Sequence, residues 1–194
     1  MRKIRFIDLF CGCGGLSLGF EQAGFIPVAG IDFKESAINT YHEHFKNAKA
    51  LCIDISLMDE RIIKSELGDL TNVDVIIGGP PCQGFSNANK NYVEADDPRN
   101  KLFFEFVKFV DLANPYVVVI ENVPQIITKN HGYAKDRITE IFQKRGYSVT
   151  NETIVKVILQ HCFDDKEDIS AMVKGHSLDK LVEKVMELIR EVYL

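Results

Sequence analysis

The sequence lacks an excess of positive charge. It holds 23 Lys and Arg against 28 Asp and Glu, a formal net charge of −5. Domains that hold nucleic acid by bulk charge are usually basic, with lysines and arginines gathered on one face. The composition therefore argues against that mode of binding, and any contact with DNA must be local or shared with another module.

The sequence also lacks an apolar run long enough for a signal peptide or a membrane span. Its first apolar stretch, residues 4–10, is interrupted by Arg5 and Asp8. The five cysteines are an odd number without framework spacing, which predicts free thiols in a reducing compartment. We expect a soluble, cytoplasmic protein without structural disulfides or membrane contact.

Metal-ligand spacing is missing as well. Cys11 and Cys13 are too close for a C-x-x-C site, and Cys52 and Cys162 have no ordered partners. We therefore expect no metal site, and interpret most of these cysteines as small buried fillers.

Strand-like and helix-like segments alternate along the chain, which has 194 residues and is 46% hydrophobic. This alternation predicts an α/β domain of ordinary size with a mostly parallel sheet. The expected strands cover residues 3–10, 26–31, 51–55, 73–77 and 116–120, and the expected helices cover 16–23, 37–45, 102–113 and 134–144. Residues 147–159 read as extended, and an amphipathic helix is expected over 177–192.

A cysteine follows the buried strand of residues 73–77 in a rigid loop. The loop reads Gly-Gly-Pro-Pro-Cys-Gln-Gly-Phe-Ser over residues 78–86, with the cysteine at Cys82. Two prolines restrict the backbone there, and the carboxyl ends of parallel strands are where ligands collect. Position and rigidity indicate a nucleophile.

A glycine-rich turn, residues 11–15, follows the first strand and leads into a helix. Ser17 stands where a dinucleotide-binding fingerprint needs its third glycine, which weakens the hypothesis of a nicotinamide-dinucleotide site. Asp32 ends the second strand twenty positions after Gly12, the separation at which nucleotide-binding units place an acid on ribose hydroxyls. Asp54, near the end of the third strand, is open to two interpretations, a ligand contact or a helix cap.

Two further features flank the cysteine loop. Residues 87–99 are polar without apolar periodicity, which fits either a lid that contacts substrate or a solvated insertion. Glu121 ends the fifth strand, and sequential parallel strands often pair, so its carboxyl and the thiol of Cys82 are expected to face one cleft. Such a carboxyl can donate a proton near neutral pH when burial raises its pKa.

In their order, these motifs resemble the cytosine-C5 DNA methyltransferase family. The similarity rests on residues 8–15, 79–86 and 121–123 and covers roughly residues 3–155. It implies a Rossmann-like, S-adenosylmethionine-dependent fold, with S-adenosylhomocysteine as the product of the cofactor. The implied cofactor contacts are Phe10, Gly12, Gly14, Gly15, Asp32, Phe33, Asp54, Ile55, Pro81 and Leu102.

The resemblance also implies a mechanism. A thiolate from Cys82 would add to cytosine C6, and Glu121 would hold and protonate N3. The target base would be flipped out of the duplex, with residues 87–99 as a closing loop. The substrate contacts implied on that loop are Ser86, Asn87, Lys90 and Arg99.

The chain departs from the family after residue 155. Residues 154–165 lack the family's Gln-x-Arg-x-Arg motif, and neither the target-recognition region nor the later cofactor motifs follow. We therefore expect a partial catalytic domain over residues 1–155, with a sheet incomplete at its C-terminal edge, and a divergent tail over 156–194.

The leading hypothesis is a DNA cytosine-C5 methyltransferase of a restriction-modification system, which needs a second polypeptide for target recognition. A truncated, catalytically silent cofactor-binding or interaction protein is the alternative, and an RNA cytosine methyltransferase is a third.

Overall fold

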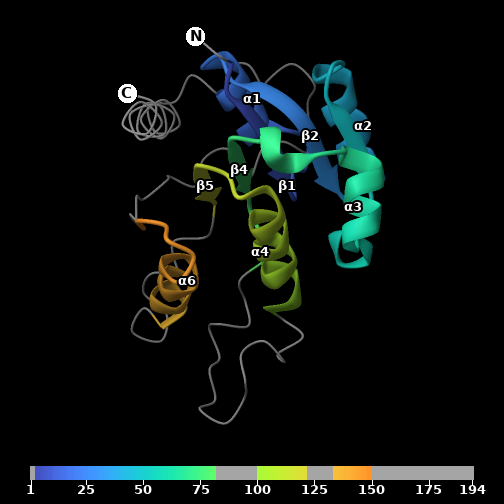
Figure 1. Ribbon diagram of the computed structural model, residues 1–194. Coiled ribbons are helices and arrows are strands. Elements are labelled where there is room, and N and C mark those ends of the chain that lie inside the picture. The colour runs from blue at the N-terminus through green and yellow to red at the C-terminus, as the bar shows by residue number, and fades with distance from the viewer. Residues whose placement is uncertain (1–2, 82–99, 122–132, 150–194) are drawn as a thin grey trace.

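A computed structural model describes residues 3–81, 100–121 and 133–149. Within them, five parallel strands form one sheet in the order β3-β2-β1-β4-β5 (Figure 1). The strands are β1 (Arg5–Leu9), β2 (Ile26–Asp32), β3 (Lys49–Cys52), β4 (Val75–Gly78) and β5 (Val117–Ile120). The α/β class and the pairing of β4 with β5 are confirmed.

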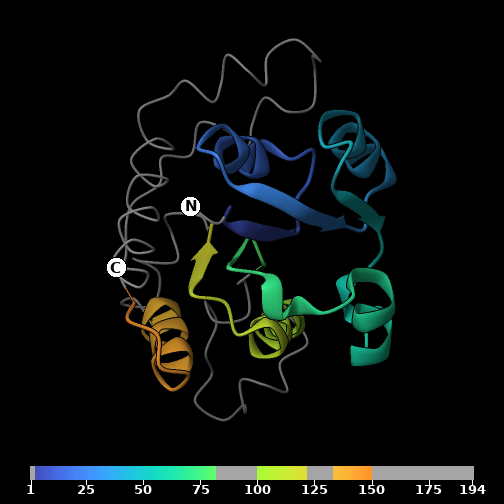
Figure 2. The same cartoon turned by 45° about the horizontal axis from the view of Figure 1, so that its top comes forward.

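Helices cover both faces of this sheet. They are α1 (Gly15–Gln22), α2 (Glu35–His44), α3 (Glu60–Leu67), α4 (Lys101–Ala113) and α6 (Tyr133–Gln143), with 3₁₀ turns η1 (Ile55–Leu57) and η2 (Leu70–Asn72). Helices α1 and α2 lie on one side, and α3, α4 and α6 lie on the other (Figure 2). The result is the three-layer arrangement expected of parallel strands joined by crossover helices.

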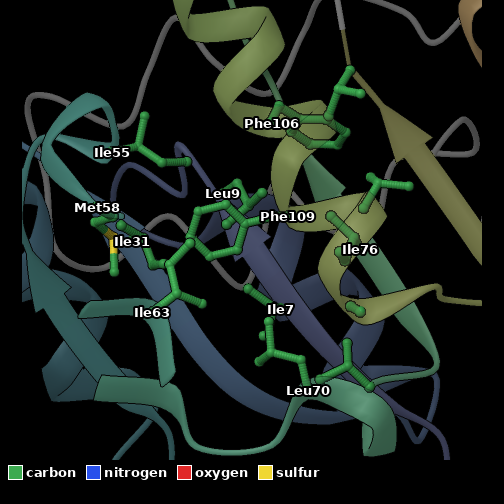
Figure 3. Close-up of a cluster of buried hydrophobic side chains, with 14 of the residues drawn as sticks. Ile7, Leu9, Ile31, Ile55, Met58, Ile63, Leu70, Ile76, Phe106 and Phe109 are labelled. Atoms are coloured by element: carbon green, nitrogen blue, oxygen red, sulfur yellow. The ribbon is translucent and has the colours of Figure 1, made fainter. Parts of the chain in front are cut away.

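Alternation along β1 divides the core between the two faces. Ile7 and Leu9 point toward α3 and α4, where they meet Phe106 and Phe109 in the larger cluster (Figure 3). Phe6 points the other way, into a smaller cluster with the α1 side chain Phe20. Burial on both faces explains why the strands are continuous apolar runs, and why a charged residue inside one is informative.

Two sequence expectations need correction. The third strand ends at Cys52, because the Asp54 side chain accepts a hydrogen bond from the Ser56 N–H at 2.9 Å and starts η1. Residues 147–149, at the start of the stretch expected to be extended, belong to no strand, and residues 150–159 lie outside the described residues; the Tyr147 hydroxyl donates to the Pro115 carbonyl at 2.8 Å. Cys52 is exposed rather than a buried filler.

None of the helices in the described ranges is long and apolar enough to cross a membrane. Among the same residues, no group of three or more histidine, cysteine or carboxylate side chains is arranged to hold a metal ion.

Candidate active site

The carboxyl ends of all five strands meet at one edge of the sheet, because every neighbouring pair is parallel. The glycine turn after β1, Asp32 at the end of β2 and Asp54 after β3 lie along one half of this edge. The chain at Gly79 and Glu121 follows β4 and β5 on the other half. Sheet topology thus brings the candidate ligand-binding and catalytic segments together, as expected at such an edge.

The turn after β1 is held by backbone hydrogen bonds and left-handed dihedrals. Cys11 N–H donates to the Ile31 carbonyl at 3.1 Å, and Gly14 N–H donates to the Cys11 carbonyl at 2.9 Å. The φ angles of Phe10, Gly12 and Gly14 are 63°, 53° and 94°. A β-carbon on Gly12 would meet no atom within 4 Å, so the backbone there is open to close approach by a ligand.

Asp32 ties this turn to the second strand. Its Oδ2 accepts a hydrogen bond from the Gly12 N–H at 3.0 Å, and its Oδ1 accepts one from the Lys34 N–H at 2.9 Å. The spacing of twenty positions therefore corresponds to a direct contact. Each carboxylate oxygen has a further lone pair, so Asp32 can still accept hydrogen bonds from the hydroxyls of a sugar.

The neighbouring residues that are candidates for cofactor contact differ in solvent exposure. Phe33 is 74% exposed, an unusual position for a large apolar ring. Asp54 is also exposed, and hydrogen bonds from Ser56 hold its pKa below the usual value. Ile55 is buried in the larger core cluster (Figure 3). Asp54 therefore caps η1, and Ile55 packs in the core.

Glu121 sits against the start of the cysteine loop. Its N–H donates to the Gly78 carbonyl at 2.9 Å, and its Oε2 lies 3.1 Å from the point that a β-carbon on Gly79 would occupy. The side chain is partly buried, and this desolvation raises the pKa of the carboxyl. Glu121 is thus suited to hold a proton close to the loop that leads to Cys82.

The remaining candidates divide between the described and undescribed parts of the chain. Gly14 and Gly15 are buried, Pro81 is partly buried, and Leu102 in the first turn of α4 packs against the larger core cluster. The candidates outside the described residues are Cys82, Ser86, Asn87, Lys90 and Arg99, together with the tail of residues 156–194.

A buried polar cluster beneath the glycine turn was not foreseen from the sequence. Ser17 Oγ lies 2.7 Å from Asp8 Oδ2 and 3.3 Å from the Tyr41 hydroxyl. Asp8 is 1% exposed, and burial raises its pKa to about 7 although hydrogen bonds from Ser17 oppose the shift. The signal available in the sequence was an aspartate between the apolar residues Phe6, Ile7 and Leu9 of β1.

The Tyr41 ring occupies space that two glycines leave open. A β-carbon on Gly30 would come within 2.3 Å of the ring, and one on Gly14 within 2.9 Å of it. The ring of Phe45 packs beside it in a tilted pair, at a centroid distance of 4.4 Å. Tyr41, which is fully buried, therefore packs helix α2 against β2 and against the glycine turn.

The fold and this edge define the class of the protein as a Rossmann-like methyltransferase domain, with a glycine turn bonded to the acid that ends β2. The chain belongs to the family of C-5 cytosine-specific DNA methylases, which it matches over residues 4–158.

Two Type II methyltransferases are similar to this chain in sequence. The chain is 42% identical over 148 residues to the Type II methyltransferase M1.HphI of Haemophilus parahaemolyticus, covering 76% of this chain and 40% of that protein. It is 42% identical over 149 residues to the Type II methyltransferase M.DdeI of Desulfomicrobium norvegicum, covering 75% and 35%. The chain thus spans about two-fifths or less of the length of these relatives.

A solved structure of an Escherichia coli protein, encoded within a prophage and described as a DNA modification methyltransferase, has a similar fold. The TM-score is 0.59 at 34% sequence identity, covering 73% of this chain and 38% of that chain.

Proposed function

We propose that this chain transfers a methyl group from S-adenosylmethionine to C5 of cytosine in DNA, with Cys82 as the nucleophile and Glu121 as the proton donor. The observation that carries the proposal is the position of Glu121. Its carboxyl, with a raised pKa, packs against Gly79, three residues before Cys82. Family membership over residues 4–158 supports the same reaction.

The half of the sheet edge that carries the glycine turn and Asp32 suits the cofactor. Asp32 offers free lone pairs for ribose hydroxyls, and the open backbone at Gly12 suits the methionine part, which has no pyrophosphate to cradle. The exposed ring of Phe33 offers an apolar face to the adenine. When bound, the cofactor supplies an electrophilic methyl group.

The chemistry of the residues then follows from the poor nucleophilicity of cytosine C5. The thiolate of Cys82 forms a bond to C6, and the displaced electron pair is delocalised over the ring so that C5 becomes nucleophilic. Glu121 protonates N3 and thereby neutralises the charge that this addition would otherwise build up on the ring. After methyl transfer, water acting as a base takes the proton from C5, the C5–H electron pair re-forms the C5–C6 double bond, and Cys82 leaves as a thiolate while N3 returns its proton to Glu121.

Contact with DNA is proposed to fall on the loop that carries Ser86, Asn87, Lys90 and Arg99, closing over a flipped base. The net charge of −5 gives little general attraction to the duplex. We therefore propose that a second polypeptide supplies target recognition.

The decisive experiment uses DNA that contains 5-fluorocytosine, because fluorine at C5 blocks the final elimination and traps the covalent adduct. The chain should be assayed alone and with the product of the neighbouring reading frame, with Cys82→Ser as the control. An adduct that resists denaturing gel electrophoresis and is absent in Cys82→Ser supports the proposal.

If no adduct forms in either assay, the silent cofactor-binding protein is favoured. If 5-fluorocytosine in transfer RNA forms an adduct and 5-fluorocytosine in DNA does not, an RNA enzyme is favoured. Calorimetry with S-adenosylhomocysteine tests the cofactor site separately. Asp32→Ala should weaken binding strongly, and unchanged affinity would argue against this pocket.

A further inference from the structure

Hydrogen bonds connect three buried polar side chains, each from a different element, beneath the glycine turn. Asp8 belongs to β1, which enters the turn, and Ser17 belongs to α1, which leaves it. Tyr41 belongs to α2, which follows Asp32. Asp8, Ser17 and Tyr41 are 1%, 0% and 0% exposed, so the cluster touches no solvent in the structure.

The direction of the hydrogen bonds follows from counting hydrogens. Ser17 Oγ lies within hydrogen-bonding distance of both Asp8 Oδ2 and the Tyr41 hydroxyl, but it has only one hydrogen to donate. When Asp8 is ionised it can only accept, so Ser17 donates to Asp8 and the Tyr41 hydroxyl donates to Ser17. When Asp8 is protonated it can donate to Ser17, and Ser17 then donates to the Tyr41 hydroxyl. Tyr41 can satisfy either role because burial raises its pKa and keeps the phenol protonated.

This chain of hydrogen bonds fixes both ends of the turn. The Asp8–Ser17 bond ties the strand before the turn to the helix after it. The Tyr41 ring also fills the space beside Gly14 and Gly30. The turn between these anchors presents the Gly12 N–H to Asp32. A change at Tyr41 would therefore reach the ligand-binding face of the turn through Ser17 and Gly14.

We propose that Tyr41 is a positioning residue for the cofactor, acting through Ser17 and Asp8 on the turn of residues 10–14 without touching the ligand. The proposal rests on the proposed function, since it takes S-adenosylmethionine as the ligand of the turn. Buried polar networks that are fully satisfied confer a unique geometry, which is the property a preorganised site needs.

The test compares the affinity for S-adenosylhomocysteine of the full chain and of single variants, by calorimetry. Tyr41→Phe keeps the ring and removes only the hydroxyl. Loss of one net hydrogen bond from the network corresponds to about a fivefold weaker affinity. Ser17→Ala should weaken affinity by a similar factor of about five, because it removes the link that both neighbours use.

The matched control is Tyr147→Phe. Tyr147 also donates its hydroxyl to a single protein acceptor, the Pro115 carbonyl, but it lies between α6 and the start of β5, away from the turn. Tyr147→Phe should lower thermal stability to a similar extent and leave the affinity for the cofactor unchanged. A general loss of stability would affect the two tyrosine variants alike.

A double variant separates positioning from unrelated damage. If Tyr41 acts through Ser17, the double variant Tyr41→Phe with Ser17→Ala should bind no more weakly than the weaker single variant. If the double variant loses affinity by the product of the two single losses, the proposal is overturned. It is also overturned if the affinity of Tyr41→Phe for S-adenosylhomocysteine lies within twofold of that of the original chain. If the original chain binds neither S-adenosylmethionine nor S-adenosylhomocysteine, the proposed function itself fails, and this inference fails with it.

Discussion

The carboxylate oxygen Oε2 of Glu121 lies 3.1 Å from the point that a β-carbon on Gly79 would occupy. This distance is short for a carbon–oxygen contact, so a side chain at position 79 would press on the carboxyl group. The two residues directly follow neighbouring strands, since β4 and β5 pair with Gly78 opposite Ile120. The absence of a side chain at Gly79 therefore makes room for the proposed proton donor.

Gly79→Ala should displace Glu121 with little effect on folding. The added methyl group meets the end of a flexible side chain, which can move aside at small cost. We expect formation of the 5-fluorocytosine adduct to slow at least about tenfold, because a misplaced proton donor loses most of its contribution. Thermal melting should change little.

The control for this variant is Gly68→Ala. Gly68 has a φ of 76° and a ψ of −145°, a conformation that is nearly restricted to glycine, and no atom lies within 4 Å of an added β-carbon. Alanine there therefore costs about 1–3 kcal/mol of backbone strain without a steric clash. It should lower stability and leave adduct formation intact. Equal rates for Gly79→Ala and the original chain would contradict the role given to this contact.

Glu121→Gln should raise stability at neutral pH while abolishing adduct formation. Burial raises the pKa of Glu121 above its usual value of 4.5, so the folded state binds more protons than the unfolded state just above that pH. The favourable contribution of the protonated carboxyl is complete at lower pH and is lost as pH rises through the folded pKa. Glutamine has no such loss.

Thermal melting at a series of pH values checks this prediction. The melting temperature of Glu121→Gln relative to the original chain should increase from pH 4 to pH 7. A difference that decreases over the same range would show that the carboxyl is ionised and stabilised in the folded state.

The sequence was a good guide to the fold where local pattern and global topology agree. The β-branched run before Gly78 marks β4, and the twenty positions between Gly12 and Asp32 correspond to a hydrogen bond of 3.0 Å. Parallel order then explains why β4 and β5 are neighbours. Such features depend on strand burial and on a recurrent βαβ geometry, both of which leave a pattern in the sequence.

The sequence was a poor guide where a single side chain decides between two local structures. Ile53 and Ile55 extend an apolar alternation, yet the Asp54 cap ends the strand early and places Ile55 in the core. The Asp8, Ser17 and Tyr41 cluster could not be foreseen, because each residue has an ordinary interpretation on its own. Their contact depends on how α1 and α2 pack on the sheet. The nucleophilic role of Cys82 stays a prediction.

Gly30→Ala should destabilise the domain through Tyr41. A β-carbon at position 30 would lie 2.3 Å from the Tyr41 ring, which is fully buried and cannot move freely. Overpacking of this kind costs about 1–3 kcal/mol or more in free energy of unfolding, measurable by denaturant titration. The same change in a Tyr41→Leu background should cost less, and an equal cost would place the clash elsewhere.

Asp8→Asn should remove a pH dependence of stability. Burial, with a smaller contribution from the charge of Asp32, raises the pKa of Asp8 from 3.8 to about 7. The folded state therefore binds the extra proton between these values, and the stabilisation is complete below pH 3.8 and lost as pH rises through about 7. The free energy of unfolding of the original chain should fall over this range relative to Asp8→Asn, by at most about 4 kcal/mol.

The groups that face Asp8 make this assignment testable. Cys11 from the turn and Tyr41 from α2 both have pKa values raised by burial, so they stay neutral throughout the range. Ser17 from α1 donates the hydrogen bond that lowers the pKa of Asp8. Ser17→Ala should therefore shift the loss of stability to higher pH, and denaturant titrations between pH 5 and pH 9 would detect the shift. A shift to lower pH would mean that Ser17 does not stabilise the ionised carboxylate, and that the titrating group lies elsewhere.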